Sequence, residues 1–318
     1  MRYKKFGRMG WEVSVISAGT WTLGGEAYKG VDSEEGIRAI HALIERGVNH
    51  IDTAAAYSNG ASEKLVGRAL KGIRDKVYIT TKGGLGPNGR DSSRAFLLSQ
   101  VEDSLRNLQT DYIDNYIIHW PDPKTPFEET MGLLMDLKRQ GKIRAIGVSN
   151  FSREQIEEAL QYGDVDNVQM GYSMVSRGDH DLFVWAHDRK MATMSFSSLA
   201  AGILTGAYRS LPKFEEGDVR ATLYDYFREP VFSQVMELLK VMDEIAKERD
   251  VTLAQIAINW STQQPFLDTA LVGANRVSEA IENCKGLDWS LSEAEMITLN
   301  QAIEKYLGGI VRIFSMEA

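Results

Sequence analysis

The feature of this sequence that most constrains its fold is a strand-then-helix pattern that repeats along most of the chain. Short apolar runs alternate with segments whose apolar residues recur at helical spacing, as Ile37, Ile40 and Ile44 do. Eight runs have the character of strands, at 13–19, 48–52, 77–82, 113–119, 143–148, 166–170, 191–196 and 269–272. Repeated β-α units form parallel sheets with right-handed crossovers, and eight such units close into a barrel. The sequence therefore predicts an α/β fold, specifically a (β/α)8 TIM barrel.

Capping residues and glycines mark the helices between these strands. Ser33 is expected to cap the first helix, and Gly47 to follow its end. The helix that Asp91 precedes should have an apolar face made of Leu98, Val101, Leu105 and Leu108. Further helices are expected at 62–70, 127–139, 152–162 and 179–189.

Two segments fall outside the repeat. Arg2–Phe6 and Glu12–Ile16 flank a turn that contains glycine, which predicts an N-terminal β-hairpin capping one end of the barrel. Residues 205–230 form a long connection rich in glycine, proline and charge, and loops of this length usually serve a function. No linker interrupts residues 1–318, so a single barrel domain is expected.

Composition and charge argue against several classes of partner. The formal net charge of -8 disfavours nucleic acid and anionic membranes as partners. The one cysteine, Cys284, forms no internal disulfide and fits a reducing cytoplasm. No signal peptide is recognisable, and no apolar run approaches the ~20 residues of a membrane span. We expect a cytoplasmic protein that acts on a small molecule, as a monomer or a homo-oligomer.

Four ionisable residues stand where apolar runs end and polar loops begin, and we call Asp52, Tyr57, Lys82 and His119 the tetrad. Strand ends of a parallel barrel meet at one rim, which is where such barrels do chemistry. An ammonium group beside a phenol stabilises phenolate and lowers the phenol's pKa, and a carboxylate holds the ammonium in place. A histidine could orient a carbonyl oxygen next to the phenol. No residue here supplies hydride, so a nicotinamide would have to.

Taken singly, each tetrad residue also has an ordinary structural role. An aspartate after a strand often caps a turn, and a loop tyrosine more often packs than reacts. A lysine that ends a strand usually leaves the core for solvent. The coincidence of four such residues at the same ends of three neighbouring strands favours proton transfer to or from an oxygen.

Several stretches resemble the aldo-keto reductase family, nearly end to end and in the right order. They read GVNHIDTAAAY (47–57), SEKLVGRAL (62–70), ITTK (79–82), DYIDNYIIHWP (111–121) and GKIRAIGVSNF (141–151). The resemblance implies an oxidoreductase that interconverts a carbonyl and its alcohol, with Tyr57 as general acid/base. Lys82 would tune Tyr57, Asp52 would pair with Lys82, and His119 would orient the substrate.

The same resemblance implies a nicotinamide dinucleotide, NADP(H), held by a defined set of positions. They are Gly19, Thr20, Trp21, Asp52, Ser149, Asn150, Gln169, Phe196, Ser197, Leu199, Ala201, Gly202, Leu204, Gly273, Asn275, Arg276, Glu279 and Asn283. Ser149, Asn150 and Gln169 would bind the carboxamide, and Phe196 would lie under the ring. The loop after Thr205 would fold over the cofactor.

Residues at the two ends of the expected site should determine which cofactor and which substrate it binds. Asn275 and Arg276 would reach a 2′-phosphate, and arginine there favours NADP(H) by charge-assisted bonds. A carboxylate at Glu279 opposes a phosphate, so NAD(H) is the alternative cofactor. At the other end, the substrate, an aldehyde, a ketone or a sugar or inosose, is expected to contact Trp21, Tyr28, Tyr57, His119 and Trp120.

Other interpretations are weaker or stay open. Residues 84–89 match the glycine pattern of a Rossmann site, but Pro87 and Asp91 place the helix start beyond the glycines, so we expect a flexible loop there. The five histidines show no metal-binding spacing. A Schiff-base aldolase that uses Lys82 is a second enzyme hypothesis. A nicotinamide-binding, redox-sensing subunit that docks on a partner protein is the alternative outside catalysis.

Overall fold

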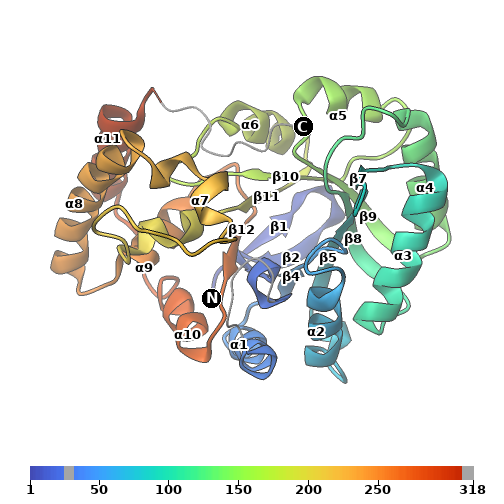
Figure 1. Cartoon of the computed structure of the whole chain (residues 1–318), viewed down its shortest axis with the longest axis horizontal. Helices are drawn as coiled ribbons and strands as arrows, with labels where there is room; N and C mark the ends of the chain where they lie inside the picture. Colours follow the sequence, from blue (N-terminus) through green and yellow to red (C-terminus); the bar gives the residue numbers. More distant parts are fainter. Residues whose placement is uncertain (25–31, 310–318) are drawn as a thin grey trace.

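The computed structural model describes residues 1–24 and 32–309, and at its centre eight parallel strands close into a barrel (Figure 1). The last of these strands pairs with the first, because Val272 lies beside Ala18 and Gly273 beside Gly19. In chain order the barrel strands are β3 (Ile16–Gly19), β4 (His50–Asp52), β5 (Tyr78–Gly83), β8 (Ile113–Ile118), β9 (Ile143–Ser149), β10 (Asn167–Gly171), β11 (Ala192–Phe196) and β12 (Thr269–Gly273). The predicted (β/α)8 barrel is confirmed, with all eight strands where the sequence pattern places them.

Helices surround the barrel and cover its outer surface (Figure 1). The first six are α1 (Ser33–Glu45), α2 (Ala61–Ala69), α3 (Arg94–Leu108), α4 (Phe127–Arg139), α5 (Arg153–Ala159) and α6 (His180–Asp188). The others are α7 (Arg220–Leu223), α8 (Val231–Arg249), α9 (Leu253–Thr262), α10 (Val277–Lys285) and α11 (Glu293–Leu307). All ten residues of α9 are buried, because this helix lies between the barrel strand β12 and the outer helix α8. Its buried polar residues are hydrogen-bonded: the Gln255 amide donates to the Glu282 carboxylate, and the Asn259 amide donates to the Gly286 carbonyl.

Two details of the helices differ from the sequence prediction. Helix α1 is capped by Asp32, not by Ser33, since the Asp32 carboxylate accepts hydrogen bonds from the backbone N–H groups of Glu34 and Glu35. Either side chain can cap a helix, and the pattern alone does not choose between neighbours. In α3 the buried face contains Leu97 and Val101, whereas Leu98 is exposed. The predicted face is thus rotated by one residue at its beginning.

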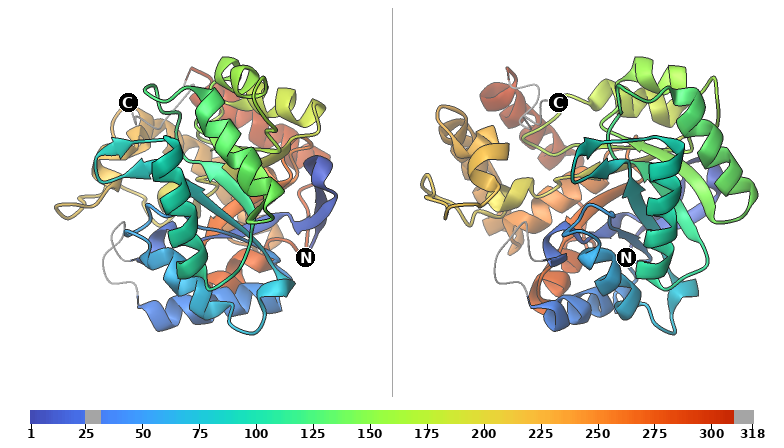
Figure 2. Two further views of the ribbon diagram at one scale, coloured as in Figure 1. Left: turned by 90° about the vertical axis from the view of Figure 1, so that its right-hand side faces the viewer. Right: turned by 45° about the vertical axis from the view of Figure 1, so that its right-hand side comes forward.

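The predicted N-terminal hairpin is present, as β1 (Tyr3–Phe6) paired antiparallel with β2 (Trp11–Ser14). It covers the amino ends of the barrel strands, with Phe6 fully buried. Gly7 has a φ of +50°, and a Cβ there would come within 2.4 Å of the Ala192 backbone nitrogen. Figure 2 shows this hairpin on one side of the molecule and the segment after β11 on the opposite side.

The other end of the barrel is covered by two excursions of the chain. The glycine-rich stretch after β5 forms a small antiparallel hairpin, β6 (Leu85–Gly86) and β7 (Gly89–Arg90), where the sequence suggested a flexible loop. The long connection 205–230 contains α7 and a 3-10 helix at Asp225–Phe227. Its aromatic rings pack on one another: the Tyr208 and Phe227 centroids are 5.3 Å apart, and those of Phe214 and Phe227 are 4.9 Å apart.

The barrel interior combines apolar packing with a hydrogen-bonded polar layer. Its apolar part includes Phe6, Ile117 and Met194. The polar layer centres on His50, whose Nδ1 lies 2.8 Å from the Ser17 hydroxyl and whose Nε2 lies 2.8 Å from the Thr80 hydroxyl. Burial lowers the pKa of His50 to about 3, so the ring is neutral at physiological pH. None of the helices in the described part of the chain has the length and apolar character of a membrane span.

Candidate active site

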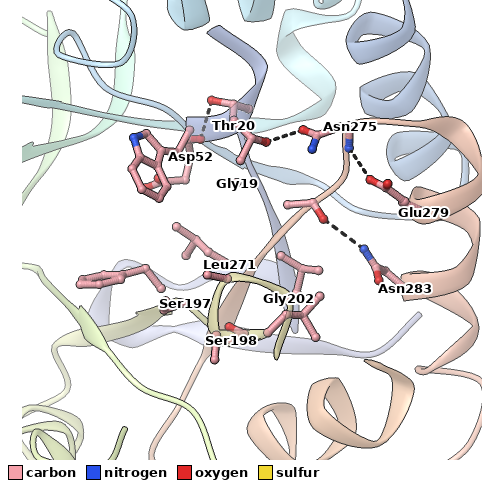
Figure 3. Close-up of a pocket in the computed structure, with 18 of the residues that line it drawn as sticks. Gly19, Thr20, Asp52, Ser197, Ser198, Gly202, Leu271, Asn275, Glu279 and Asn283 are labelled. Carbon is pink, nitrogen blue, oxygen red and sulfur yellow. Dashed lines mark hydrogen bonds between the residues drawn. The ribbon is translucent and has the colours of Figure 1, made fainter. Parts of the chain in front are cut away.

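A cavity of about 1190 Å³ opens at the carboxyl ends of the barrel strands. It extends from the tetrad, past the turn after β11, to the beginnings of α1 and α10. Figure 3 shows Asp52 near one end, and Asn275, Glu279 and Asn283 together at the other. The cavity is large enough for a ligand much longer than a small carbonyl compound, since typical ligand pockets hold about 300–1,000 Å³.

Lys82 is the centre of the hydrogen-bonded network at the tetrad end. Its Nζ donates to the Asp52 carboxylate at 2.5 Å, to the Thr53 backbone carbonyl at 2.9 Å and to the Tyr57 hydroxyl oxygen at 3.0 Å. Asp52 is also held from the far side, because the Gln169 amide donates to its second oxygen at 2.7 Å. Strands β4, β5 and β10 thus place one carboxylate, one ammonium group and one amide in mutual contact.

Burial sets the protonation states in this network. It raises the pKa of the Tyr57 phenol above its ordinary value, although the Lys82 ammonium opposes that rise. Burial alone would lower the pKa of Lys82, but Asp52 and Tyr57 together raise it. Lys82 therefore pulls the phenol's pKa downward, as the sequence suggested, but burial is the larger effect. Both groups hold their protons at neutral pH.

His119 follows β8 directly and faces Tyr57, with the two ring centroids 5.7 Å apart in an edge-on arrangement. Burial, assisted by the positive charge of Lys82, lowers the pKa of His119 well below its ordinary value, so the ring is neutral. The side-chain amide of Asn150 donates to the His119 backbone carbonyl at 3.0 Å and fixes the end of β8 against the end of β9. A neutral imidazole here can donate a hydrogen bond to an oxygen without a competing charge.

The turn after β11 exposes backbone to the cavity. Ser197, Ala201 and Gly202 have φ values of 64°, 50° and 92° and line the cavity, and Figure 3 labels Ser197 and Gly202 there. Within this turn the backbone N–H groups of Ala200 and Gly202 donate to the carbonyls of Ser197 and Leu199 at 2.8 and 3.0 Å. Phe196, just before this turn, packs against Gly171, where a Cβ would come within 3.1 Å of the ring.

The far end of the cavity is formed where α1 meets α10. The Thr22 hydroxyl donates to the Asn275 side-chain oxygen, and the Asn283 amide donates to the Gly273 carbonyl at 3.2 Å. The Glu279 carboxylate accepts from the Asn275 backbone N–H at 2.8 Å (Figure 3). Arg276 is exposed at the N-cap of α10.

The structure brings nearly all of the predicted site residues to this one cavity. Those that line it are Gly19, Thr20, Trp21, Asp52, Tyr57, His119, Trp120, Ser149, Asn150, Gln169, Phe196, Ser197, Leu199, Ala201, Gly202, Gly273, Asn275, Arg276, Glu279 and Asn283. Lys82 lies behind Tyr57 and Asp52. Leu204 does not line the cavity, and its side chain is fully buried in the core. Tyr28 lies outside the described residues.

Sequence reasoning missed several residues of the cavity wall. Tyr208 and Arg220 come from the long connection, and the Arg220 guanidinium donates to the Tyr208 hydroxyl at 2.6 Å and pairs with Asp218. Glu35 comes from the first turn of α1. The only signal for Arg220 was the unusual length of its connection. Nothing near Glu35 in the sequence pointed to a site.

Comparison with known proteins gives a consistent set of relatives. A family model described as "Aldo/keto reductase family" matches residues 15–304. "Aldo-keto reductase YhdN" of Bacillus subtilis is 37% identical over 315 residues, which cover 96% of this chain and 94% of the relative. "NADH-specific methylglyoxal reductase" of Escherichia coli is 32% identical, with 92% and 95% covered. A "Probable voltage-gated potassium channel subunit beta" of Arabidopsis thaliana is 31% identical, with 91% and 92% covered.

Solved structures agree with this result. The glycerol dehydrogenase AKR11B4 from Gluconobacter oxydans superposes with a TM-score of 0.87 at 31% identity, over 99% of this chain and 98% of that one. An aldo/keto reductase from Klebsiella pneumoniae, solved in complex with NADP and acetate, gives a TM-score of 0.78 at 28% identity, over 99% and 100%.

Proposed function

Because this chain belongs to the aldo/keto reductase family, we propose that it is a cytoplasmic, NADP(H)-dependent oxidoreductase that interconverts a carbonyl and its alcohol. The observation that carries the proposal is the contact of one buried ammonium group, Lys82, with both Asp52 and Tyr57. Residues 1–318 would act as a single catalytic barrel domain. The proposed substrate is an aldehyde, a ketone or a sugar or inosose.

The cavity fits a nicotinamide dinucleotide by its shape and its donors. The Ser198 hydroxyl and His119 Nδ1 are buried and have no hydrogen-bond partner within residues 1–24 and 32–309. The turn at Ser197 to Gly202 would bring backbone close to a pyrophosphate, while its Ala200 and Gly202 N–H groups stay bonded within the turn. Phe196 would lie beneath the nicotinamide ring, with Ser149 and Asn150 at its carboxamide. When bound, this cofactor supplies or accepts the hydride.

We infer that Tyr57 moves the proton. In the reduction direction its hydroxyl donates a proton to the carbonyl oxygen, and the phenolate that forms is stabilised by the Lys82 ammonium at 3.0 Å. Asp52 keeps Lys82 charged and in place. The neutral His119 ring donates a hydrogen bond to the same oxygen and orients it. In the oxidation direction the phenolate takes the proton back from the alcohol.

The comparisons support NADP(H) as the cofactor of choice. The Klebsiella pneumoniae relative was solved with NADP. In this chain, Arg276 is exposed at the far end of the cavity, where a 2′-phosphate would need a positive charge. NAD(H) remains the alternative, because the Escherichia coli relative is named as NADH-specific.

The substrate end of the cavity is bordered by aromatic side chains. Trp21, Tyr57 and Trp120 line it, together with Leu85 from the β6–β7 hairpin. The Arg90 guanidinium lies 4.8 Å from the Trp120 ring centroid and holds that ring in place. Flat apolar rings of this kind favour a sugar face or an aromatic aldehyde over a strongly charged substrate.

Replacement of Tyr57 by phenylalanine tests the proposal. Tyr57→Phe is expected to lower kcat for carbonyl reduction by about 100-fold to 10,000-fold, the range of a general acid, because the proton donor is lost. Dinucleotide affinity, measured by quenching of tryptophan fluorescence, should change little. The measurement is NADPH oxidation at 340 nm across aldehydes, ketoses and inososes.

Tyr116→Phe is the matched control. Tyr116 is a fully buried tyrosine of the barrel strand β8, and unlike the partly buried Tyr57 it does not line the cavity. Its loss of a hydroxyl should leave kcat within about twofold of the wild type. Retention of full activity by Tyr57→Phe would show that another group donates the proton.

The Schiff-base aldolase alternative is disfavoured by the geometry. Imine formation needs an accessible, unprotonated amine. Lys82 is 1% exposed, and Asp52 and Tyr57 raise its pKa, so the amine stays charged. Borohydride in the presence of a carbonyl substrate is therefore expected to leave the mass of the protein unchanged.

A second candidate function follows from the relative named as a probable potassium channel subunit beta. In that case the chain would bind a nicotinamide cofactor tightly, turn over slowly and dock on a partner protein. Fast multiple-turnover reduction without a co-purifying partner would favour the enzyme over the docking subunit.

A further inference from the structure

Among residues 1–24 and 32–309, those that line the cavity end between α1 and α10 carry more negative than positive charge. Asp32 and Glu35 line it from the beginning of α1, and Glu279 and Glu282 line it from α10. Arg276 is the one basic residue that α10 contributes to the wall. This balance is unusual for a place proposed to receive a 2′-phosphate, because phosphates prefer clustered positive charge.

Glu35 occupies the position where an anion would bind to α10. Its carboxylate accepts a hydrogen bond from the backbone N–H of Val277, the first residue of α10, at 3.0 Å. The free N–H groups of a first helical turn are a common phosphate site. The second carboxylate oxygen of Glu35 accepts two hydrogen bonds from the Arg38 guanidinium, at 2.9 and 2.6 Å. A carboxylate of the protein thus takes both the N–H group and the nearest arginine of α1.

Glu35 also remains charged at neutral pH. The Val277 N–H, and after it Arg38, hold the pKa of Glu35 below its ordinary value. The Glu279 carboxylate likewise accepts a hydrogen bond from the backbone N–H of Asn275. The two backbone donors that flank Arg276 are therefore already engaged by acidic side chains.

We propose that Glu35 weakens the preference of this site for NADP(H), because it disfavours the 2′-phosphate, so that NAD(H) can bind as well. The inference rests on the proposed function, since it needs a dinucleotide in this cavity. A phosphate close to a fixed carboxylate meets like-charge repulsion, whereas a ribose hydroxyl can donate a hydrogen bond to it. Acidic residues that bind the ribose hydroxyl distinguish NAD from NADP in other dinucleotide sites for the same reason.

The test compares Glu35→Gln with Glu34→Gln. The first change keeps the shape of the side chain but removes its charge and weakens its hold on Arg38. The second removes the same charge from the same helix turn, at a residue that pairs with Arg68 and does not line the cavity. The measurement is the Kd of NADPH and of NADH without substrate, by quenching of tryptophan fluorescence, since Trp21 and Trp120 line the cavity.

Wild-type protein is expected to prefer NADPH over NADH by less than about tenfold. Glu35→Gln should tighten NADPH by about fivefold to tenfold, the scale of one charge pair near a protein surface, and leave NADH within about twofold. Glu34→Gln should change neither Kd. Arg38→Ala, which leaves Glu35 without its counter-charge, should weaken NADPH and spare NADH.

Three results would overturn the inference. Equal effects of Glu35→Gln on both cofactors, or no effect on either, contradict it while the proposed function stands. A wild-type preference for NADPH by more than about tenfold also contradicts it, because Glu35 would then not control the choice. Absence of binding by either dinucleotide overturns this inference and the proposed function together.

Discussion

Lys82 shows how a single residue can organise the reacting end of the cavity. A buried ammonium group is costly unless it is paired and fully hydrogen-bonded. Lys82 has three donors, and the structure gives all three an oxygen, from Asp52, Thr53 and Tyr57. The hydrogen bonds to Asp52 and Thr53 offset the cost of burying the ammonium group, and the hydrogen bond to Tyr57 places its positive charge beside the phenol. Structural and chemical roles are therefore joined in one side chain.

Removal of this charge should affect stability and activity separately. Lys82→Met is expected to lower the free energy of unfolding by about 3–5 kcal/mol, because Asp52 is left buried without a counter-charge. The double variant Asp52→Asn/Lys82→Met should recover most of that loss, since no charge then stays buried. Carbonyl reduction should remain abolished in both variants. Urea unfolding and initial rates give the two readouts, and recovery of activity together with stability would contradict the proposed role of Lys82.

The pH dependence follows from the raised pKa of Tyr57. In the proposed mechanism reduction requires the protonated phenol, and burial raises the phenol's pKa above its ordinary value. The rate of reduction is therefore expected to stay level from about pH 6 to about pH 8 and to fall only on the alkaline side. The reverse reaction needs phenolate and should rise over the same alkaline range. A reduction rate that already falls through neutral pH would mean that the phenol's pKa is lowered.

At this scale the sequence predicted residue types better than their partners. Asp52, Lys82 and His119 could be placed because each ends a buried strand, and a barrel brings strand ends together. The bond from Gln169 to Asp52 could not be foreseen, because it joins strands that are far apart in the chain. Leu204 lies apart from the cavity, because backbone turns in the segment Ala200–Thr205 leave its side chain in the core.

Among the elements, the pairing of β5 with β8 positions the tetrad most directly. Gly83 follows Lys82 at the end of β5, and it leaves room for the Tyr116 ring of β8. A Cβ on Gly83 would lie 1.9 Å from the Tyr116 hydroxyl oxygen. That hydroxyl is buried and has no hydrogen-bond partner in the part of the chain that the structure describes. The glycine and the tyrosine are therefore fitted to each other.

Paired substitutions test this fit. Gly83→Ala is expected to be severely destabilising, because the new methyl group overlaps Tyr116. Tyr116→Phe alone should be neutral or stabilising by about 1 kcal/mol, since it removes an unsatisfied buried hydroxyl. In the double variant Gly83→Ala/Tyr116→Phe, part of the loss should be recovered. Thermal denaturation of the four proteins gives the coupling, and additive effects would show that the two residues do not share this contact.

Elements were predictable where the sequence kept a simple period. Helix α4 matches its prediction at both ends, because its apolar residues recur regularly and Gly141 follows. Helix α9 is buried on every side, and its polar residues Gln255, Asn259 and Thr262 bond to other parts of the chain, so its pattern shows no solvent-exposed face. The two-residue strands of the β6–β7 hairpin are too short for any pattern. Their pairing depends on glycines that the sequence suggested only as a loop.

On the scale of the whole molecule, Asp268 fastens the N-terminal hairpin to the barrel. Its carboxylate accepts from the backbone N–H groups of Gly7 and Thr193, both at 3.1 Å. Burial nevertheless raises the pKa of Asp268 to about 6, because desolvation exceeds the help from these donors. The contribution of this group to stability is therefore complete below the ordinary aspartate pKa. It is lost as the pH rises through about 6.

Asp268→Asn isolates this effect. The amide keeps an oxygen for both N–H groups but does not titrate. Relative to this variant, the wild type should lose unfolding free energy between about pH 5 and about pH 7.5. His50, whose buried neutral ring works in the opposite direction as the pH falls, is present in both proteins and cancels in the difference. Urea unfolding at the two pH values gives the readout, and parallel pH profiles would contradict the assignment.

The architecture as a whole was the most predictable level, because eight strand-helix repeats leave few alternatives to a closed barrel. The strand-helix repeat could not show how the two ends of the barrel differ. The hairpin covers one end, and the 205–230 segment borders the cavity at the other. The contact of Glu35 with Val277 exists only because the barrel closes, and it joins residues on the first and the tenth helix.

That closure also has a consequence for the protein during its synthesis. The tetrad leaves the ribosome within the first half of the chain, but β12, which seals the barrel against β3, emerges near the end of translation. Pairing over so long a separation in sequence is slow and waits for the full chain. A nascent or prematurely terminated polypeptide thus contains all four tetrad residues but lacks the closed barrel that holds them in place. We expect such fragments to be bound by chaperones or degraded and to show no partial activity.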